Sequence, residues 1–531
     1  MKVLTSEQMR RVDERAIRRM KVPGLVLMEN AGLRAFDLLL EGWPDLRPGG
    51  VIVLCGGGNN GGDGLVIARH LAGAGLAPRV ILAARKADLR GDARVNLRAA
   101  AGIGLTIEET ATPAAWRKIA GSLDGFQVIV DALLGTGLRG AVRGFAARII
   151  EDVNRAAAAG AGVLAVDIPS GLSGSSGEVP GPAVAATRTV TFCRPKIAHV
   201  LPPACDLVGT LHVVAIGIPD AAVEAEKDAR LHLVEPRWLA ARLRPRSPGA
   251  HKGEFGDLLI IAGSRDRSGA AALAARAALR GGAGLVTVAT AASAQPILAP
   301  QAAEMMTSPL AETRAGAVSE AAIERALELA AGRDVLAVGP GLGADPPTRA
   351  FVRRFVAATR QPLVLDADGL NAFEGKGAEL SGRERVLVIT PHPGEMARLA
   401  GSTIRRVLAD RLAAARKVAA ARRCWVVLKG HRTIIAGPDG LTHVNPTGNP
   451  GMATAGAGDA LTGFLAALLG CRYEPRDACL LAVWLHGRAG DLAAGRLGKE
   501  ALTAGDLIEA WPEALRELTE VNPRPARARA R

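Results

Sequence analysis

The 531-residue sequence predicts an α/β protein with two successive domains. Short runs of β-branched and apolar residues alternate with alanine-rich helical segments, a pattern typical of parallel sheets covered by helices on both faces. This alternation occurs twice, and a charged stretch ending in ARLRPRSPG separates the two series. The length agrees with this division, because it accommodates roughly two to four domains of about 150 residues each.

The first series predicts a Rossmann-like, doubly wound sheet within residues 1–219. Several of its expected strands end in Gly, Asp or Pro, and ligands bind at the carboxyl ends of such strands. The expected strands are residues 51–55, 79–82, 127–130, 163–166 and 189–192. Residues 220–248 are interpreted as a short helix and a linker.

The second series predicts another α/β domain within residues 249–515. Two long helical stretches close it, at 458–469 and 477–494. The expected strands are residues 257–262, 284–289, 335–338, 363–365, 385–390 and 425–428. Residues 516–531 are interpreted as a basic, disordered tail, since the last eight residues carry four Arg among Pro and Ala.

Composition argues against several classes of protein. Aromatic residues make up 3%, with a single Tyr, which disfavours a platform for stacking nucleic-acid bases. No nucleic-acid-binding motif accompanies the net charge of +14, and phosphorylated small molecules explain a basic surface equally well. Six widely spaced cysteines without a CxxC pair predict neither a disulfide framework nor a zinc site.

The sequence predicts a cytoplasmic protein. Its N-terminus is charged and lacks the apolar core of a signal peptide. The longest uncharged stretch, residues 281–303, contains Gly, Pro, Gln and Thr and does not resemble a membrane span. We expect small-molecule substrates, no nucleic-acid or membrane partner, and a homo-oligomer.

A glycine-rich loop follows the first expected strand of the Rossmann-like domain. Residues 56–64 read GGGNNGGDG, with six glycines in nine positions, and a helix is expected to begin there. Glycines allow close backbone approach to a ligand, and a helix N-terminus attracts phosphate. A plain strand-to-helix turn is the alternative, but it needs only one or two glycines.

Two further strand ends carry polar residues. VDALLGTGLRG (130–140) contains a GxGxxG pattern, which alone is weak evidence for a dinucleotide. VDIPSG (166–171) adds a carboxylate and a hydroxyl. Because Asn60, Asp131 and Ser170 all offer oxygen atoms, a hard cation is plausible, although a carboxylate there could simply cap a helix.

NNGGDG, VDALLGTGLRG, VDIPSGL, TVTFCRPK and VVAIGIP, in this order, resemble the NAD(P)H-hydrate epimerase domain over residues 1–219. The resemblance implies interconversion of the R and S hydrates at C6, with potassium bound by Asn60, Asp131 and Ser170. Asp167 would contact the nicotinamide hydrate, and a carboxylate suits the required proton movement. Lys196 is either a cation near the phosphates or an ordinary surface residue. The implied substrate-binding residues are Asn59, Asn60, Gly61, Gly62, Asp63, Gly135, Thr136, Gly137, Leu138, Arg139, Gly140, Ala141 and Asp167.

The sharpest signal in the second half is GAGD, residues 456–459. Small residues at a helix start form an anion hole, and Asp459 could take a proton from a substrate hydroxyl. Alone, the segment could equally be a glycine turn with an N-capping Asp. Together with TPHPGE (390–395) and LKGHRT (428–433), it favours phosphoryl transfer from a nucleotide, without a P-loop.

The motifs HKG, GPGLG, DADGLN, TPHPGE and GAGD resemble the ribokinase-like superfamily, and within it the ADP/ATP-dependent NAD(P)H-hydrate dehydratase, over about residues 235–515. The resemblance implies that Asp459 assists phosphorylation of the C6 hydroxyl, after which phosphate is eliminated. Magnesium is expected, with Asp366 and Asp368 as candidate ligands, and His392 could instead only fix a turn. The implied hydrate contacts are Ala271, Gly341, His392 and Asp459, and the nucleotide contacts are Lys429, Gly430, His431, Arg432, Thr433 and Gly458.

The sequence therefore predicts a bifunctional repair enzyme for hydrated NADH and NADPH. The epimerase supplies the S hydrate, and the dehydratase consumes ADP or ATP and releases NAD(P)H, AMP or ADP, and phosphate. Two alternatives are a small-molecule kinase for a vitamin or sugar in the second half and a non-catalytic binding module in the first.

Overall fold

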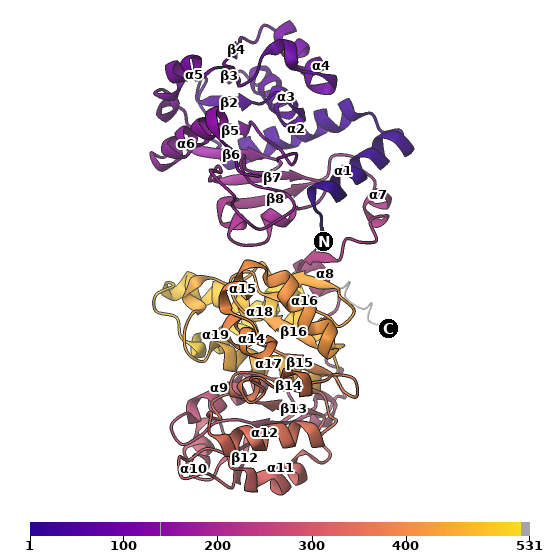
Figure 1. The fold of residues 1–531 in the computed structure, drawn as a ribbon, viewed down its shortest axis with the longest axis vertical. Coiled ribbons are helices and arrows are strands. Elements are labelled where there is room, and N and C mark those ends of the chain that lie inside the picture. The colour runs from indigo at the N-terminus through magenta and orange to yellow at the C-terminus, as the bar shows by residue number, and fades with distance from the viewer. Residues whose placement is uncertain (139, 522–531) are drawn as a thin grey trace, which may run out of the picture. The chain divides into compact units, whose positions relative to one another are not determined.

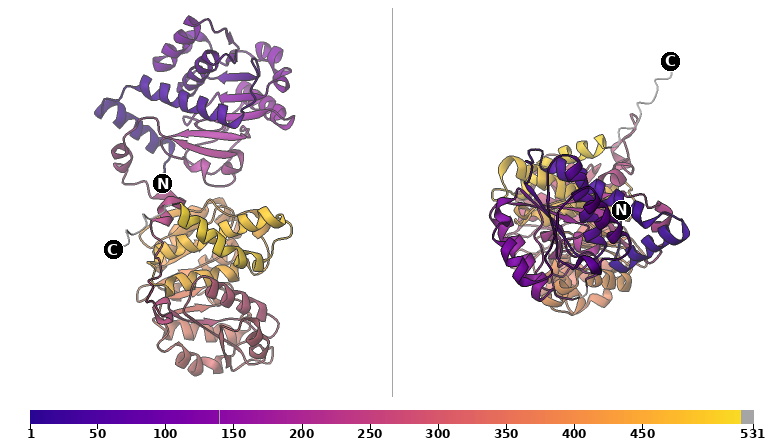
Figure 2. Two further views of the ribbon diagram at one scale, coloured as in Figure 1. Left: turned by 180° about the vertical axis from the view of Figure 1, so that it is seen from behind. Right: turned by 90° about the horizontal axis from the view of Figure 1, so that it is seen from above.

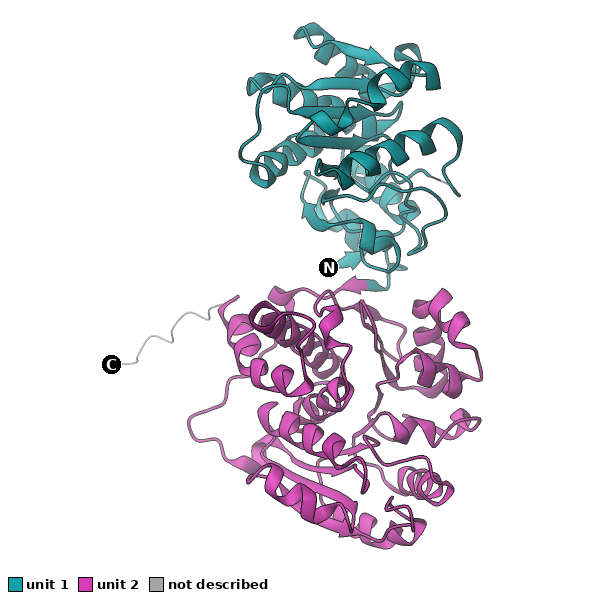
Figure 3. Ribbon diagram, turned by 90° about the vertical axis from the view of Figure 1, so that its left-hand side faces the viewer, with its two compact units in different colours: residues 1–231 teal, residues 232–531 magenta. Residues whose placement is uncertain are grey.

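The computed structural model describes residues 1–138 and 140–521, and the chain forms two compact units that divide between Leu231 and His232 (Figure 3). The division lies inside the segment 220–248 that the sequence analysis interprets as a linker. Residues 220–231 fold with the first unit, where they include helix α7 (Asp220–Glu224). Arg139, an implied substrate contact, and residues 522–531 of the expected tail lie outside the described residues.

The first unit is a parallel sheet in the strand order β4-β3-β2-β5-β6-β7-β8 (Figure 1). The chain runs outward from β2 to β4 and then returns to β5 beside β2, so the strand order reverses there. Ligands bind at such a reversal in open α/β sheets. The strands are β2 (Val51–Cys55), β3 (Arg79–Leu82), β4 (Ile107–Glu109), β5 (Val128–Ala132), β6 (Gly162–Val166), β7 (Arg188–Phe192) and β8 (Thr210–Val214), and β1 (Lys2–Val3) precedes them.

Helices cover both faces of this sheet, as the apolar strands require. One core contains buried residues of α2, α3 and α4, and the other contains those of α5 and α6. The predicted doubly wound, Rossmann-like fold is confirmed. The helices are α1 (Ser6–Glu14), α2 (Gly24–Gly42), α3 (Asn59–Gly73), α4 (Gly91–Gly102), α5 (Pro113–Ala120) and α6 (Gly144–Ala158), and a π-helical turn, η1 (Arg15–Arg19), follows α1.

The second unit contains a mixed sheet in the order β18-β17-β16-β15-β14-β13-β10-β11-β12. Strands from β16 to β12 pair in parallel, whereas β17 and β18 form antiparallel pairs. The strands are β10 (Asp257–Ile261), β11 (Leu285–Ala291), β12 (Met306–Leu310), β13 (Val335–Val338), β14 (Leu363–Leu365), β15 (Leu387–Ile389), β16 (Trp425–Leu428), β17 (Ile434–Ala436) and β18 (Thr442–Val444), and β9 (Leu231–Leu233) lies at the division of the units.

A helical layer built on α9, α17, α18 and α19 shares one large core with this sheet. The helices of this layer are coloured rose (α9) and yellow (α17 to α19) in Figure 1 and Figure 2. The helix backbones of α17 and α9 approach closely at Gly463, where an added Cβ would lie 2.0 Å from the carbonyl oxygen of Ala274. The helices are α8 (Pro236–Ala240), α9 (Ser268–Arg280), α10 (Gln295–Leu298), α11 (Ile323–Ala330), α12 (Pro346–Ala358), α13 (Asp368–Asn371), α14 (Pro393–Ala400), α15 (Ile404–Ala409), α16 (Arg411–Arg422), α17 (Ala457–Gly470), α18 (Pro475–Leu497) and α19 (Ala504–Glu520).

Helix α19 ends at Glu520 and therefore includes the first residues of the segment 516–531 expected to be a tail. Leu518 explains the difference, because its side chain is fully buried in the core of the second unit. None of the described helices combines the length and the apolar character needed to cross a bilayer.

Candidate active sites

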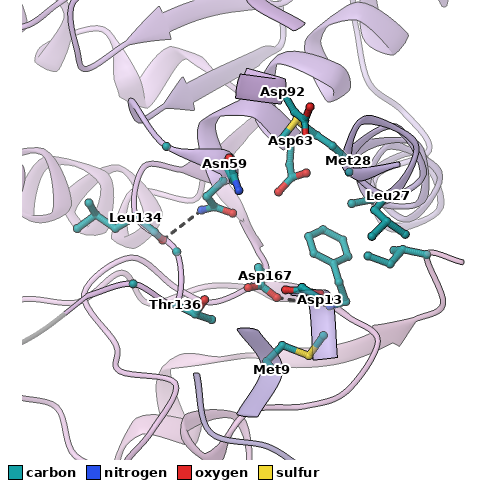
Figure 4. A pocket seen from close by; sticks show the side chains of 18 of the residues that line it. Met9, Asp13, Leu27, Met28, Asn59, Asp63, Asp92, Leu134, Thr136 and Asp167 are labelled. Carbon is teal, nitrogen blue, oxygen red and sulfur yellow. Dashed lines mark hydrogen bonds between the residues drawn. The ribbon is translucent and has the colours of Figure 1, made fainter. Parts of the chain in front are cut away.

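The first unit contains a cavity of about 690 Å³ where the loops after β2, β5, β6 and β7 meet helices α1 and α2 (Figure 4). These loops follow the reversal of strand order, as expected for a ligand crevice. Of the implied substrate contacts, Asn59, Asn60, Asp63, Gly135, Thr136, Gly137, Leu138 and Asp167 line this cavity. The described contacts Gly61, Gly62, Gly140 and Ala141 do not belong to its lining.

The glycine-rich loop is shaped by close backbone contacts. A Cβ at Gly56 would lie 1.9 Å from the carbonyl oxygen of Leu133, and one at Gly61 would lie 1.9 Å from that of Gly56. The glycines therefore bring the loop after β5 against the start of α3. Gly58, the N-cap of α3, has open space around its Cα, so the helix N-terminus faces the cavity and can receive an anion.

The three implied potassium ligands are buried: Ser170 and Asp131 are hydrogen-bonded to each other, and Asn60 is linked to Ser170 through the backbone of Leu134. Ser170 donates its hydroxyl to Oδ1 of Asp131 at 2.6 Å and its backbone N–H to Oδ2 at 2.8 Å. Asn60 donates to the Leu134 carbonyl oxygen at 3.1 Å, which leaves Asn60 Oδ1 buried without a partner among the described residues. Burial raises the pKa of Asp131 to about 6, although the Ser170 hydrogen bonds oppose the rise.

Lys196 is a buried partner of Asp167, so the surface alternative for this lysine is wrong. Its side chain is 1% exposed, and Nζ lies 2.5 Å from Asp167 Oδ1 and 2.9 Å from Thr191 Oγ1. Burial alone would raise the pKa of Asp167, but the Lys196 ammonium prevails and holds that pKa below its ordinary value. Asp167 is therefore an anion at neutral pH.

Two other carboxyl groups of this cavity have pKa values that are raised instead of lowered. Burial, reinforced by the charge of Asp167, raises the pKa of Asp63 well above its ordinary value. Asp13 on α1 also lines the cavity, and burial raises its pKa to about 7. The sequence analysis did not include Asp13, because no motif marks this helix and its role depends on tertiary packing.

The second unit contains a cavity of about 620 Å³ between the loop after β16, the loop after β18 and the start of α17. All of the implied nucleotide contacts line it, namely Lys429, Gly430, His431, Arg432, Thr433 and Gly458. His392 lines the same cavity, whereas the other implied hydrate contacts, Ala271, Gly341 and Asp459, are not part of its lining.

A lysine–carboxylate cluster lies beside this cavity. Lys429 Nζ lies 2.7 Å from Asp366 Oδ1 and 3.8 Å from Glu395 Oε2, and Thr462 donates its hydroxyl to Asp366 Oδ2 at 2.8 Å. Burial raises the pKa of Asp459 to about 6, with Asp366 adding to the rise and Lys429 opposing it. Asp459 lies in the first turn of α17, so the sequence predicted its place at a helix start.

His392 both caps a helix and borders the cavity, so its two interpretations are compatible. His392 Nδ1 accepts a hydrogen bond from the Gly394 N–H at 3.0 Å, and the backbone N–H of His392 donates to Glu395 Oε2 at 2.7 Å. Burial, aided by the positive charge of Lys429, lowers the pKa of His392, which keeps the ring neutral at physiological pH. Glu395, within the TPHPGE motif, was not singled out by the sequence analysis.

The GPGLG loop holds Asp368, one of the two candidate magnesium ligands. Gly343 donates its N–H to Asp368 Oδ2 at 2.8 Å, and Arg267 Nη1 lies 3.5 Å from the same oxygen. Gly341 has φ of 65°, which favours glycine, and an added Cβ would meet the Arg267 carbonyl oxygen at 2.8 Å. The GPGLG loop therefore holds the Asp368 side chain in place. Ala271, an implied hydrate contact, is fully buried in α9.

Together these features define an α/β enzyme with two separate sites, one rich in carboxylates and one built for phosphoryl chemistry. Residues 24–198 match the family described as YjeF-related protein N-terminus, and residues 258–513 match the family NAD(P)H-hydrate dehydratase. A bifunctional NAD(P)H-hydrate repair enzyme of Moorella thermoacetica is 44% identical over 523 residues, covering 98% of both chains. One of Escherichia coli is 36% identical and covers 91% of this chain and 88% of its own.

Solved structures are similar to the second unit. An ADP/ATP-dependent NAD(P)H-hydrate dehydratase from Bacillus subtilis, crystallised with ATP and Mg²⁺, is 31% identical and covers 54% of this chain and 98% of its own, with a TM-score of 0.47. The chain belongs to the family of bifunctional NAD(P)H-hydrate repair enzymes.

Proposed function

We propose that this chain repairs hydrated NADH and NADPH by epimerising the R and S hydrates at C6 and then dehydrating the S hydrate at the expense of ADP or ATP. The observation that carries the proposal is the presence of both sites in one chain that matches repair enzymes over its full length. This full-length match disfavours a vitamin or sugar kinase joined to a non-catalytic module.

In the first unit, Asp167 is the base for epimerisation. Lys196 keeps its carboxylate ionised, and a carboxylate can accept the proton that inversion at C6 releases. The N-terminus of α3, with Asn59 and Asn60, receives the phosphates of the hydrate.

The group formed by Asn60, Asp131 and Ser170 fits a potassium ion. Asn60 Oδ1 is a buried acceptor without a partner among the described residues, and Asp131 is a buried carboxyl that no Lys or Arg of residues 1–138 and 140–521 pairs with. Oxygen atoms of this kind suit a hard cation. When bound, potassium would supply a fixed positive charge beneath the loop after β5.

In the second unit, the nucleotide occupies the cavity bordered by residues 429–433 and Gly458. Asp459 takes the proton of the C6 hydroxyl as its oxygen attacks the terminal phosphoryl group. Phosphate is then eliminated, which restores the dihydronicotinamide, and each tenfold gain in rate corresponds to about 1.4 kcal/mol of barrier. Asp366 and Asp368 remain the candidate carboxylate ligands for Mg²⁺, which when bound would neutralise charge on the phosphates.

The test is recovery of absorbance in the reduced-nicotinamide band from mixed R and S NADPH hydrate, with ADP or ATP and magnesium. We expect complete recovery by the wild type, recovery of only the S share by Asp167→Ala, and none by Asp459→Ala. A stable phosphorylated product without recovered NADPH would instead support the kinase alternative.

The sequence also favours a homo-oligomer in the cytoplasm without nucleic-acid or membrane partners, and we retain this as part of the proposal. Light scattering of the purified chain gives its oligomeric state, and a repeat with added nucleic acid tests whether the chain binds it.

A further inference from the structure

The epimerase cavity contains a carboxyl group that the proposed mechanism does not yet use. Asp13 on α1 lines the cavity together with Asp63, Asp167 and Lys196 (Figure 4). Unlike Asp167, which is hydrogen-bonded to Lys196 and Thr191, Asp13 has no hydrogen bond to its carboxyl group within the described part of the chain. Its oxygen atoms are therefore available to a ligand.

Helix α1 holds Asp13 in place from its opposite face. Arg11 and Arg15, each two positions from Asp13, bond to the buried carboxylate of Glu226 at 2.6 and 2.8 Å. Residues two positions apart on a helix point in nearly opposite directions, so this contact directs Asp13 toward the cavity. A π-helical turn, a feature often found at functional sites, begins two residues after Asp13, at Arg15.

We infer that Asp13 is a second proton-transfer residue of the epimerase, acting as the acid while Asp167 acts as the base. This inference rests on the proposed function of the first unit. Epimerisation exchanges the face of C6 that carries oxygen, which involves giving one proton and taking another; two carboxyl groups in opposite protonation states can divide this work.

The step balances without any reactant other than water. Asp13 gives its proton to the C6 hydroxyl, the C6–O bond breaks, and its electron pair leaves with the water. The N1 lone pair forms a C6=N1 double bond. Water then adds to the opposite face of C6, the N1 lone pair is restored, and the released proton passes to Asp167. Proton exchange between Asp167 and its neighbour Asp13 resets the site.

The surroundings of Asp13 suit an acid at neutral pH. Burial raises its pKa to about 7 against the opposing charge of Lys196, and the charge of Asp167 adds to the rise. At pH 7 about half of the Asp13 carboxyl groups are therefore protonated, whereas Asp167 is ionised. Asp13 interacts electrostatically with several charged or titratable groups. They are Glu14 on its own helix, Asp63 from α3, Asp167 after β6, and Cys193 and Lys196 after β7.

The experiment compares Asp13→Asn with Glu14→Gln in the full chain. Glu14→Gln is a matched control, because it removes a carboxyl from the same helix at an exposed position outside the cavity. The substrate is R-NADPH hydrate with ADP and magnesium, and excess Asp167→Ala chain supplies dehydratase so that epimerisation limits the rate.

We expect Asp13→Asn to lower kcat for the R hydrate by about 100-fold or more, with KM changed little. Wild-type epimerisation should decline as the pH rises through about 7, since Asp13 then loses its proton, and Asp13→Asn should lack this decline. Asp13→Glu should recover part of the rate, and Glu14→Gln and the dehydration of S hydrate should stay at wild-type levels.

An Asp13→Asn variant with the wild-type rate and pH profile, or one altered only in KM, would overturn the inference. A loss of rate that Asp13→Glu does not relieve, accompanied by a lowered melting temperature, would reassign Asp13 to structure. If the wild type converts S hydrate but never R hydrate, the proposed function of the first unit fails, and the role of Asp13 fails with it.

Discussion

Removal of the Lys196 ammonium tests how the epimerase site maintains an ionised carboxylate. In the folded protein Lys196 lies 2.5 Å from Asp167, and its side chain is 1% exposed. Lys196→Met keeps much of the side-chain volume but leaves Asp167 without its cation. Breaking a buried ion pair in this way costs about 3–5 kcal/mol, because one charge remains uncompensated.

The pH dependence of this loss has a definite sign. In the wild type the pKa of Asp167 lies below its ordinary value, so the pair stabilises the fold at neutral pH and stops doing so as the pH falls through that low pKa. In Lys196→Met, burial is no longer opposed and raises the pKa of Asp167. The difference in stability from the wild type should therefore shrink in acid.

The assay is urea denaturation of the full chain at pH 7 and in mild acid, combined with the epimerisation rate. Lys196→Met should lower the unfolding free energy of the first unit, reduce epimerisation at least about 100-fold, and leave S-hydrate dehydration intact. The double variant Lys196→Met/Asp167→Asn should regain much of the lost stability, because it removes the unpaired charge and Asn tolerates the φ of 63° at residue 167. A single variant as stable as the wild type would refute the reasoning.

Three further predictions concern the other parts of the molecule. The kcat/KM for dehydration should rise with pH through about 6, as Asp459 loses its proton, and Asp459→Asn should abolish the reaction; a flat profile would exclude this base. Replacing potassium by choline should slow epimerisation but not dehydration, whereas equal rates in both salts would exclude the ion. Gly463→Ala should lower the unfolding free energy of the second unit by about 1–3 kcal/mol in chemical denaturation, because its Cβ would meet the Ala274 carbonyl oxygen at 2.0 Å. The control is Gly495→Ala on α18, where an added Cβ has open space.

The central strands could be predicted from the sequence because each is a short apolar run that is buried on both faces. β2, β13 and β16 have the predicted bounds. Edge strands could not be recognised in this way. β8 reads TLHVV and is only partly buried, and β12 contains a proline, so neither presents an apolar run.

The candidate site residues show a similar contrast: those in local motifs could be predicted, and those that depend on tertiary packing could not. Residues that belong to local motifs, such as Asn60, Asp63 and Lys429, were predicted to serve their sites, and the structure places them along the two cavities. Asp13 and Lys196 could not be assigned from sequence, because their environment is created by α1 and by the loop after β7 folding over the sheet. Burial and pairing of charges are tertiary properties, and spacing alone does not encode them.

The two units have separate hydrophobic cores, so destabilising the first unit and destabilising the second unit have different consequences for the cell. A substitution that destabilises only the first core leaves dehydration running, so the S share of the damaged cofactor is still rescued and the R share accumulates. A substitution that destabilises the second core blocks dehydration of both epimers, because the epimerase only interconverts the R and S hydrates. Inherited or engineered damage to the second unit should therefore deplete the reduced cofactor pool further than equal damage to the first.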